Sequence, residues 1–181
     1  MSNDSDLAQG PGFKYWNKMA PKTTLHFFCG KMAAGKSTLA VELAKANNAI
    51  LLVEDDWLSH LYPEEITDIQ EYIRYSVRLK NILFNHVVSL LSHGVSVVLD
   101  FPANTKDQRN WFRAIYERAN ASHTLHFVDV SNDTCKRQLK ERSKDKPEGS
   151  AFTSDAEYDA ITKYFQAPSE DEGFNIIRYQ R

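Results

Sequence analysis

Eight consecutive residues near the start of the chain have the types and spacing of a phosphate-binding loop. Residues 30–37 read GKMAAGKS, a complete match to the pattern G-x-x-x-x-G-K-[ST]. Glycines at these positions let the backbone curl, so that successive N–H groups point at phosphate oxygens. A short apolar run (24–29) precedes the loop and a helical pattern (36–46) follows it, which is the context that the motif requires.

Each polar residue of the loop has a predicted task. We expect Lys36 to reach the β and γ phosphates of a nucleotide, Ser37 to ligate Mg²⁺ through its hydroxyl, and Thr38 to help bind the α phosphate. ATP is favoured over GTP because the chain has neither an NKxD nor a DxxG motif. The residues predicted to bind the nucleotide are Gly30, Ala33, Ala34, Gly35, Lys36, Ser37, Thr38 and, from the lid described below, Arg137.

Acidic residues follow two predicted strands, at the edge of the sheet where ligands bind in open α/β folds. Asp55 and Asp56 come after the strand predicted over 49–53, and a carboxylate there could accept the proton of an attacking hydroxyl. We favour Asp55 as this base and assign Asp56 to the substrate; alternatively, these acids only cap the next helix. Asp100 ends the strand predicted over 95–99 and would orient Mg²⁺ or contact the substrate.

The next residues, FPANT, contain Asn104, a further predicted substrate contact. Phe101 and Pro102 would either shape an acceptor pocket or pack within a loop.

Basic residues cluster before a flexible segment with the sequence SKDKPEGS. Arginines that close over a transferring phosphoryl group stabilise its charge, so we expect Arg137 and Arg142 to belong to a lid over about 137–152. Either residue could instead stabilise the end of a helix through the helix dipole. Arg78 is a predicted substrate contact, and Arg74 and Arg109 could equally touch acceptor or phosphate. We interpret the six histidines as structural.

Apolar runs that alternate with helical patterns predict the fold. Strands are expected at 24–29, 49–53, 95–99, 125–130 and 174–179, with helices at 36–46, 64–93, 105–119, 132–143 and 154–165. Nearly continuous apolar strands joined by helices indicate a parallel sheet covered on both faces, hence a three-layer α/β fold. The chain is interpreted as a polar lead (1–22) and one domain (23–181).

The bulk composition limits the classes of function. With 22 Lys and Arg against 24 Asp and Glu, the formal charge is -2, which disfavours avid nucleic-acid binding. The two cysteines have no metal-ligand or disulfide spacing. No signal peptide or membrane span is recognised, so we expect a cytoplasmic protein without membrane partners. Its oligomeric state is left open.

Five segments follow one another along the chain: GKMAAGKST, EDDW, VVLDFPANTKDQR, CKRQLKER and KYFQAPSEDEGFNII. Their order resembles that of the small P-loop kinases of the polynucleotide kinase, zeta toxin and chloramphenicol phosphotransferase group, often labelled AAA-type ATP-binding domains. The resemblance covers about 24–179. It implies a five-stranded sheet in the order 2-3-1-4-5, Asp55 as general base and Arg142 in the lid. Two departures concern polynucleotide binding, because Leu58 and Gln138 replace arginines of such relatives.

These observations favour an ATP- and Mg²⁺-dependent kinase that phosphorylates a hydroxyl of a small molecule, such as a sugar, nucleoside, sugar nucleotide or antibiotic. Three alternatives remain open: a kinase of nucleic-acid 5′-hydroxyls, a toxin similar to the zeta type, and a nucleotide-dependent switch or ATPase without an acceptor.

Overall fold

The computed structural model of the chain describes residues 22–145, 150 and 153–180. Almost all of the polar lead and part of the expected lid therefore lie outside the described residues. Five strands form one parallel sheet in the order β2-β3-β1-β4-β5. The strands are β1 (Thr24–Cys29), β2 (Ile50–Val53), β3 (Val97–Pro102), β4 (Ser122–Asp129) and β5 (Ile176–Gln180). The predicted fold class and strand order are confirmed.

Helices connect the strands as the crossovers of a parallel sheet. They are α2 (Lys36–Ala46), α3 (Glu54–Leu61), α4 (Ile69–Ser92), α5 (Lys106–Arg118), α6 (Asn132–Ser143) and α7 (Asp155–Thr162), with a 3₁₀ turn, η1, at Glu170–Glu172. Two capping boxes are formed, at Thr105 with Gln108 and at Ser154 with Glu157, and both have the residue pattern typical of this motif.

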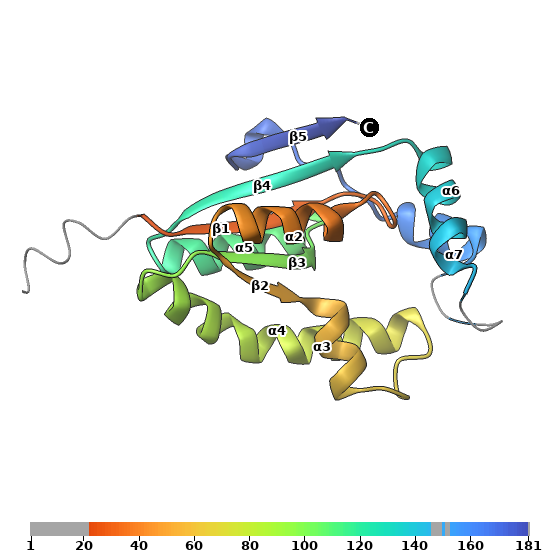
Figure 1. Ribbon diagram of the computed structural model, residues 1–181, viewed down its shortest axis with the longest axis horizontal. Helices are drawn as coiled ribbons and strands as arrows, with labels where there is room; N and C mark the ends of the chain where they lie inside the picture. Colours follow the sequence, from red (N-terminus) through yellow and green to blue (C-terminus); the bar gives the residue numbers. More distant parts are fainter. Residues whose placement is uncertain (1–21, 146–149, 151–152, 181) are drawn as a thin grey trace, which may run out of the picture.

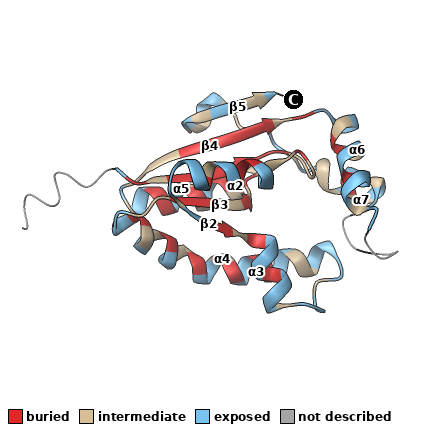
Figure 2. Ribbon diagram, in the orientation of Figure 1, coloured by how far each residue is buried: buried red, intermediate tan, exposed pale blue. Residues whose placement is uncertain are grey.

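Two apolar cores lie on opposite faces of the sheet. Phe27, Leu99 and Phe112 belong to the core beneath α4 and α5, whereas Phe28 and Leu39 belong to the core beneath α2. The ribbon shows α2 on one side of the sheet and α4 and α5 on the other, with α6 and α7 beyond the arrowheads of the strands (Figure 1). Burial is concentrated in the central strands β3, β1 and β4 and on the inward faces of these helices (Figure 2).

The element boundaries correct several predictions. The sequence pattern did not predict the eight-residue helix α3, which Glu54 begins directly after β2. The third strand starts at Val97 and continues past Asp100 to Pro102, since its backbone pairs with β2 as far as Asp100 and with β1 as far as Pro102. Phe101 is consequently a fully buried core residue, packed against Trp111, and does not line an acceptor pocket. The long helix begins only at Ile69, where Asp68 caps its first turn.

Arg109 is a structural residue and is buried completely. Its Nε lies 2.7 Å and its Nη2 2.8 Å from the two carboxylate oxygens of Glu172, and its Nη1 donates to the backbone carbonyls of Ala103 and Gln166. The contacts with Glu172 and Gln166 tie α5 to the segment before β5, and the contact with Ala103 ties it to the connection that follows β3. The idea that Arg109 contacts phosphate or acceptor was therefore wrong.

Two histidines and a tyrosine form a hydrogen-bonded chain across three strands. His26 Nδ1 lies 3.0 Å from His126 Nε2, and His126 Nδ1 lies 2.9 Å from the Tyr179 hydroxyl. Desolvation lowers the pKa of both histidines, that of His126 to about 4. The pair therefore has a structural role, as the sequence suggested.

This pair makes the fold sensitive to acid. Unfolded histidine binds a proton below about pH 6.5, whereas folded His126 does not until about pH 4, so stability falls as the pH drops between these values. From His126 alone we expect the free energy of unfolding to fall by about 2 kcal/mol between pH 7 and pH 5. Urea unfolding of the wild type and of His126→Gln measures this slope, which should persist in the exposed control His86→Gln. Equal slopes in all three proteins would contradict the prediction.

Candidate active site

The phosphate-binding loop connects β1 to α2, as predicted, and its backbone needs particular residues. Gly35 has φ 93° and Ala33 has φ 59°, both in the left-handed region. Gly30 is packed so closely against β4 that an added Cβ would lie 2.8 Å from the carbonyl oxygen of Val128. Helix α2 starts at Lys36 with no acid in its first turn, so its positive N-terminal end is available to an anion.

Lys36 lies inside the loop and stabilises its shape. Its Nζ donates to the carbonyl oxygens of Gly30, at 2.7 Å, and Lys31, at 2.8 Å. Desolvation lowers the pKa of Lys36, and the negative charge of Asp100 opposes that shift. The ammonium group is thus held at the loop. Bound phosphate oxygens would either replace these carbonyl oxygens as its acceptors or be contacted in addition to them.

Ser37 and Asp100 lie together although 63 positions separate them in the sequence. The Ser37 hydroxyl lies close enough to the Asp100 carboxylate to lower its pKa, and Asp100 lies in β3 next to β1. Burial is the main cause that raises the pKa of Asp100, while Ser37 and Lys36 act in the opposite direction. A hydroxyl and a carboxylate are oxygen ligands of the kind that Mg²⁺ prefers, so this pair fits the predicted magnesium site.

Asp55 lies on the first turn of α3, at the carboxyl end of β2. Its side chain is solvent-accessible, yet crowding by protein atoms is the main cause that raises its pKa, followed by the negative charges of Glu54 and Asp100. The positive charges of Arg142 and Lys36 act on the same carboxylate and lower its pKa. Residues from α2, α3, β3 and α6 are therefore close enough to interact electrostatically.

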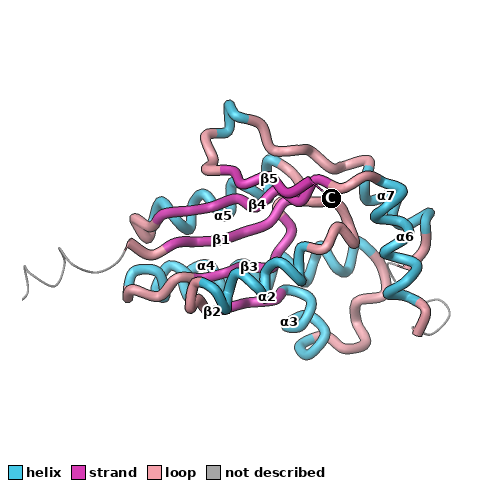
Figure 3. The backbone as a smooth tube through the Cα atoms, turned by 45° about the horizontal axis from the view of Figure 1, so that its top comes forward, coloured by secondary structure: helices cyan, strands magenta, loops and turns pink. Residues whose placement is uncertain are grey.

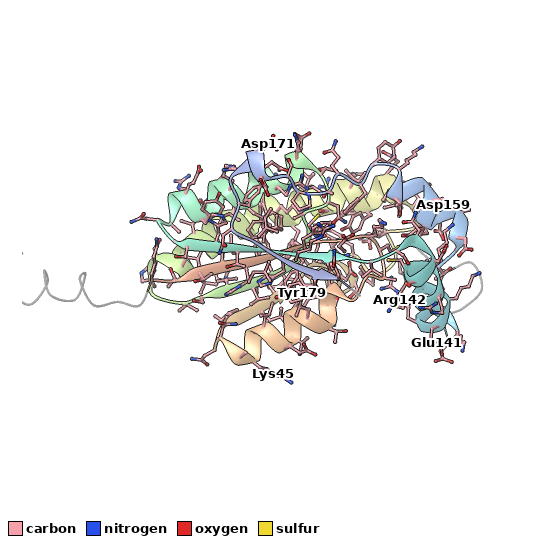
Figure 4. All side chains as sticks on the ribbon, turned by 90° about the horizontal axis from the view of Figure 1, so that it is seen from above. Lys45, Glu141, Arg142, Asp159, Asp171 and Tyr179 are labelled. Atoms are coloured by element: carbon pink, nitrogen blue, oxygen red, sulfur yellow. The ribbon has the colours of Figure 1, made fainter. Side chains whose placement is uncertain are left out.

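Helix α6 supplies the arginine that faces this cluster. The charge of Arg142 acts on both Asp55 and Lys36. Arg142 lies on α6 at the same end of the molecule as the carboxyl ends of the strands, while Glu141 lies further out (Figure 4). The tube view shows α6 and α7 standing together beyond this edge (Figure 3). Arg137 is exposed on α6 and donates to the Thr134 hydroxyl at 3.4 Å.

The remaining predicted residues have different surroundings. Asn104 supports the loop, since its Oδ1 accepts from the Gly30 N–H at 2.9 Å. Asp56 is exposed beside the cluster, and its charge acts on Asp100. Arg78 is exposed on α4, where its guanidinium lies 5.3 Å from the ring centre of Tyr75. No interaction between Arg78 and the cluster is observed within the described part of the chain.

Sequence reasoning did not single out Glu54, the first of the three acids. Its side chain is 1% exposed and accepts hydrogen bonds from Tyr72 and Ser76 of α4. The only sequence signal was an acid next to the predicted base, and that signal does not distinguish a buried carboxylate from an exposed one.

Within the described residues, no group of three or more His, Cys, Asp and Glu side chains is arranged to hold a metal ion by itself. None of the described helices combines the length and apolar character needed to cross a membrane.

Comparisons with solved structures show the fold. A candidate kinase from Chloroflexus aurantiacus J-10-fl superposes with a TM-score of 0.70 at 16% identity, covering 88% of this chain and 85% of that one. The APS kinase CysC of Mycobacterium tuberculosis, in complex with AMPPNP and APS, has a TM-score of 0.58 at 17% identity over 88% and 89% of the chains. Kti12 of Chaetomium thermophilum, in complex with ADP-AlF3, has a TM-score of 0.59 at 15% identity over 86% and 89%.

No curated protein matches the sequence significantly. A family model described as an AAA domain matches residues 25–168, which span the sheet from β1 to β4 together with α2 to α7. This match agrees with the resemblance to small P-loop kinases labelled as AAA-type domains. Since the match covers most of the chain, the protein belongs to this AAA domain family.

Proposed function

We propose that the protein is an ATP- and Mg²⁺-dependent kinase that transfers the γ-phosphate of ATP to a hydroxyl of a small molecule. The observation that carries this proposal is that Asp55 lies close enough to Lys36, Asp100 and Arg142 for their charges to act on its pKa. A nucleotide-binding loop alone accounts for Lys36 and Asp100. A carboxylate with a raised pKa beside them supplies the base that phosphoryl transfer to a hydroxyl also requires.

The proposed reaction exchanges one bond for another at phosphorus. The acceptor oxygen attacks the γ-phosphorus, the bond to the β-phosphate bridging oxygen breaks, and ADP leaves. The acceptor's proton passes to the Asp55 carboxylate. Lys36 and Arg142 place positive charge near the phosphoryl oxygens. Bound Mg²⁺ supplies further positive charge to the phosphates, and Ser37 and Asp100 are the residues that would hold it.

Similar structures support this direction. The M. tuberculosis neighbour is an APS kinase crystallised with AMPPNP and APS, and Kti12 was crystallised with ADP-AlF3. A third neighbour, from Janibacter sp. HTCC2649, is a sugar kinase. The acidic charge balance of this chain favours a small acceptor over a nucleic acid.

The test is ATP turnover with Mg²⁺ against a panel of nucleosides, sugars, sugar nucleotides, aminoglycosides and 5′-hydroxyl oligonucleotides. We expect one class of small acceptor to raise turnover and to gain phosphate. Phosphorylation of oligonucleotides alone would favour the nucleic-acid kinase. Hydrolysis of ATP that no acceptor stimulates would favour the switch or ATPase.

Asp55→Asn tests the base within this experiment. We expect kcat for transfer to fall about 100-fold or more, because asparagine cannot accept the proton, while ATP binding is retained. In the wild type, activity should fall as the pH drops through the raised pKa of Asp55, at a pH above that of an ordinary aspartate. The matched control is Asp107→Asn, an exposed acid in the first turn of α5. Unchanged kcat in Asp55→Asn would show that another group is the base.

A further inference from the structure

Glu54 is a buried carboxylate that the proposed reaction does not use. It is 1% exposed, although Asp55 and Asp56 beside it are solvent-accessible. The Tyr72 hydroxyl donates to its Oε2 at 2.5 Å, and the Ser76 hydroxyl donates to its Oε1 at 2.7 Å. The Lys80 ammonium lies 3.5 Å from Oε1. Both carboxylate oxygens therefore have partners.

All three partners come from one face of one helix. Tyr72, Ser76 and Lys80 are spaced four residues apart on α4, so their side chains lie in a row along about two turns. Glu54 belongs to the first turn of α3, and its side chain contacts this row. The contact joins the element that carries Asp55 to the first half of α4, whose N-terminus is itself fixed by the Asp68 side chain.

Helix α3 has little else to hold its first turn. It is only eight residues long, and its N-cap residue, Val53, provides no side-chain hydrogen bond. Short helices without caps are marginal on their own, so tertiary contacts must fix them. The other buried side chain of α3 is Leu58, one turn further along. Glu54 is thus the anchor nearest to the predicted base.

The anchor is a buried charged group rather than an apolar side chain. Replacing a buried ion pair by well-packed apolar residues often leaves stability unchanged, so the pairing itself is weak evidence for a stabilising role. Hydrogen bonds differ from apolar contacts in being directional, and they restrict how the first turn of α3 can rotate or shift. Such restriction matters most for the adjacent residue, Asp55.

From this geometry we infer that Glu54 is the positioning residue of Asp55: held by Tyr72 and Ser76, it keeps the first turn of α3 where Asp55 faces the phosphate-binding loop. The groups around Asp55 that depend on this placement are Lys36 of α2, Asp100 of β3, Arg142 of α6 and Tyr72 of α4. This inference rests on the proposed function, since it names how the base of that same site is held.

The experiment measures kcat and KM for hydrolysis of MgATP and for phosphorylation of whichever panel compound raises turnover. In Glu54→Gln, the amide has only one acceptor oxygen and cannot replace both oxygens of the carboxylate. We expect kcat to fall about 10- to 100-fold and KM for ATP to change less than about 2-fold, because a misplaced Asp55 affects the geometry of the reacting groups and not the binding of ATP. Tyr72→Phe, which keeps the Glu54 charge, should show a smaller loss of kcat. The control Glu64→Gln makes the same chemical change at an exposed site in the α3–α4 connection and should leave both constants unchanged.

The double variant Glu54→Gln/Asp55→Asn separates positioning from a general structural effect. If Glu54 acts through Asp55, adding Glu54→Gln to Asp55→Asn should change kcat less than about 2-fold. A further loss as large as that in the single variant would overturn the inference, as would unchanged kcat in Glu54→Gln when Asp55→Asn is impaired. If Asp55→Asn itself retains full kcat, the proposed base is wrong and the inference fails with it. If Glu54→Gln does not fold, Tyr72→Phe and Ser76→Ala, each combined with Asp55→Asn, decide by the same comparison.

Discussion

Replacing Lys36 with methionine is expected to lower phosphoryl transfer about 1000-fold, the largest effect on activity among the changes considered. The side chain has two tasks in the structure. Its ammonium group donates to the carbonyl oxygens of Gly30 and Lys31, which helps to hold the loop, and it is the positive charge nearest to where the β and γ phosphates would lie. Methionine keeps the length of the side chain but loses both the charge and the donors.

The measurement is acceptor phosphorylation and binding of a fluorescent ATP analogue, with Lys45→Met as the matched control. Lys45 is an exposed residue in the last turn of the same helix, so its replacement makes the same change of charge away from the loop (Figure 4). Full activity in Lys36→Met would contradict the assignment of the loop as the phosphate site. Loss of activity in both variants would point to a general effect of charge on α2.

Replacing Arg109 with alanine is expected to lower the free energy of unfolding by about 3–5 kcal/mol, the largest effect on stability. The variant leaves the Glu172 carboxylate without its main partner and leaves the carbonyl oxygens of Ala103 and Gln166 without donors. Hydrogen bonding to Arg109 is also the main cause that lowers the pKa of Glu172. Stability from that carboxylate exists above the pKa of unfolded glutamate and is lost as the pH falls through the folded value, so the variant should lose this dependence as well.

Urea unfolding of Arg109→Ala against Arg118→Ala tests this prediction. Arg118 ends the same helix at an exposed position, where its guanidinium lies 5.8 Å from the ring centre of Phe84, so its loss should cost about 1 kcal/mol or less. Arg109→Lys should remain strongly destabilised, because one ammonium group cannot make the two contacts to Glu172 and also reach both carbonyls. A wild-type midpoint in Arg109→Ala would mean that Glu172 finds other donors.

The same ion pair lies in a segment that carries part of the family resemblance. The residues Phe165, Pro168, Glu172, Gly173 and Phe174 carry part of the resemblance to kinase domains. In the structure, Glu172 binds Arg109, and Phe174 packs on Phe27 and beneath the Arg113 guanidinium. This part of the pattern therefore reports how the end of the chain is fastened to α5.

The sequence by itself determined the features that depend on neighbours in the chain. The loop at 30–37, the capping boxes at Thr105 and Ser154, and the alternation of strands and helices all follow from local geometry, and the three-layer parallel fold follows from that alternation. The order of the strands came from the family resemblance, since local patterns do not say which strands pair.

Only the tertiary structure decided which charged side chains meet and which are buried. Ser37 meets Asp100 because β1 and β3 are neighbours in the sheet, and Arg109 meets Glu172 because the segment before β5 returns to α5. Adjacent acids differ for the same reason: Glu54 points at α4 and is buried, while Asp55, one residue later on a helix, points toward the loop. A helical turn of about 100° per residue separates their directions, and only the position of α4 determines which of the two is enclosed.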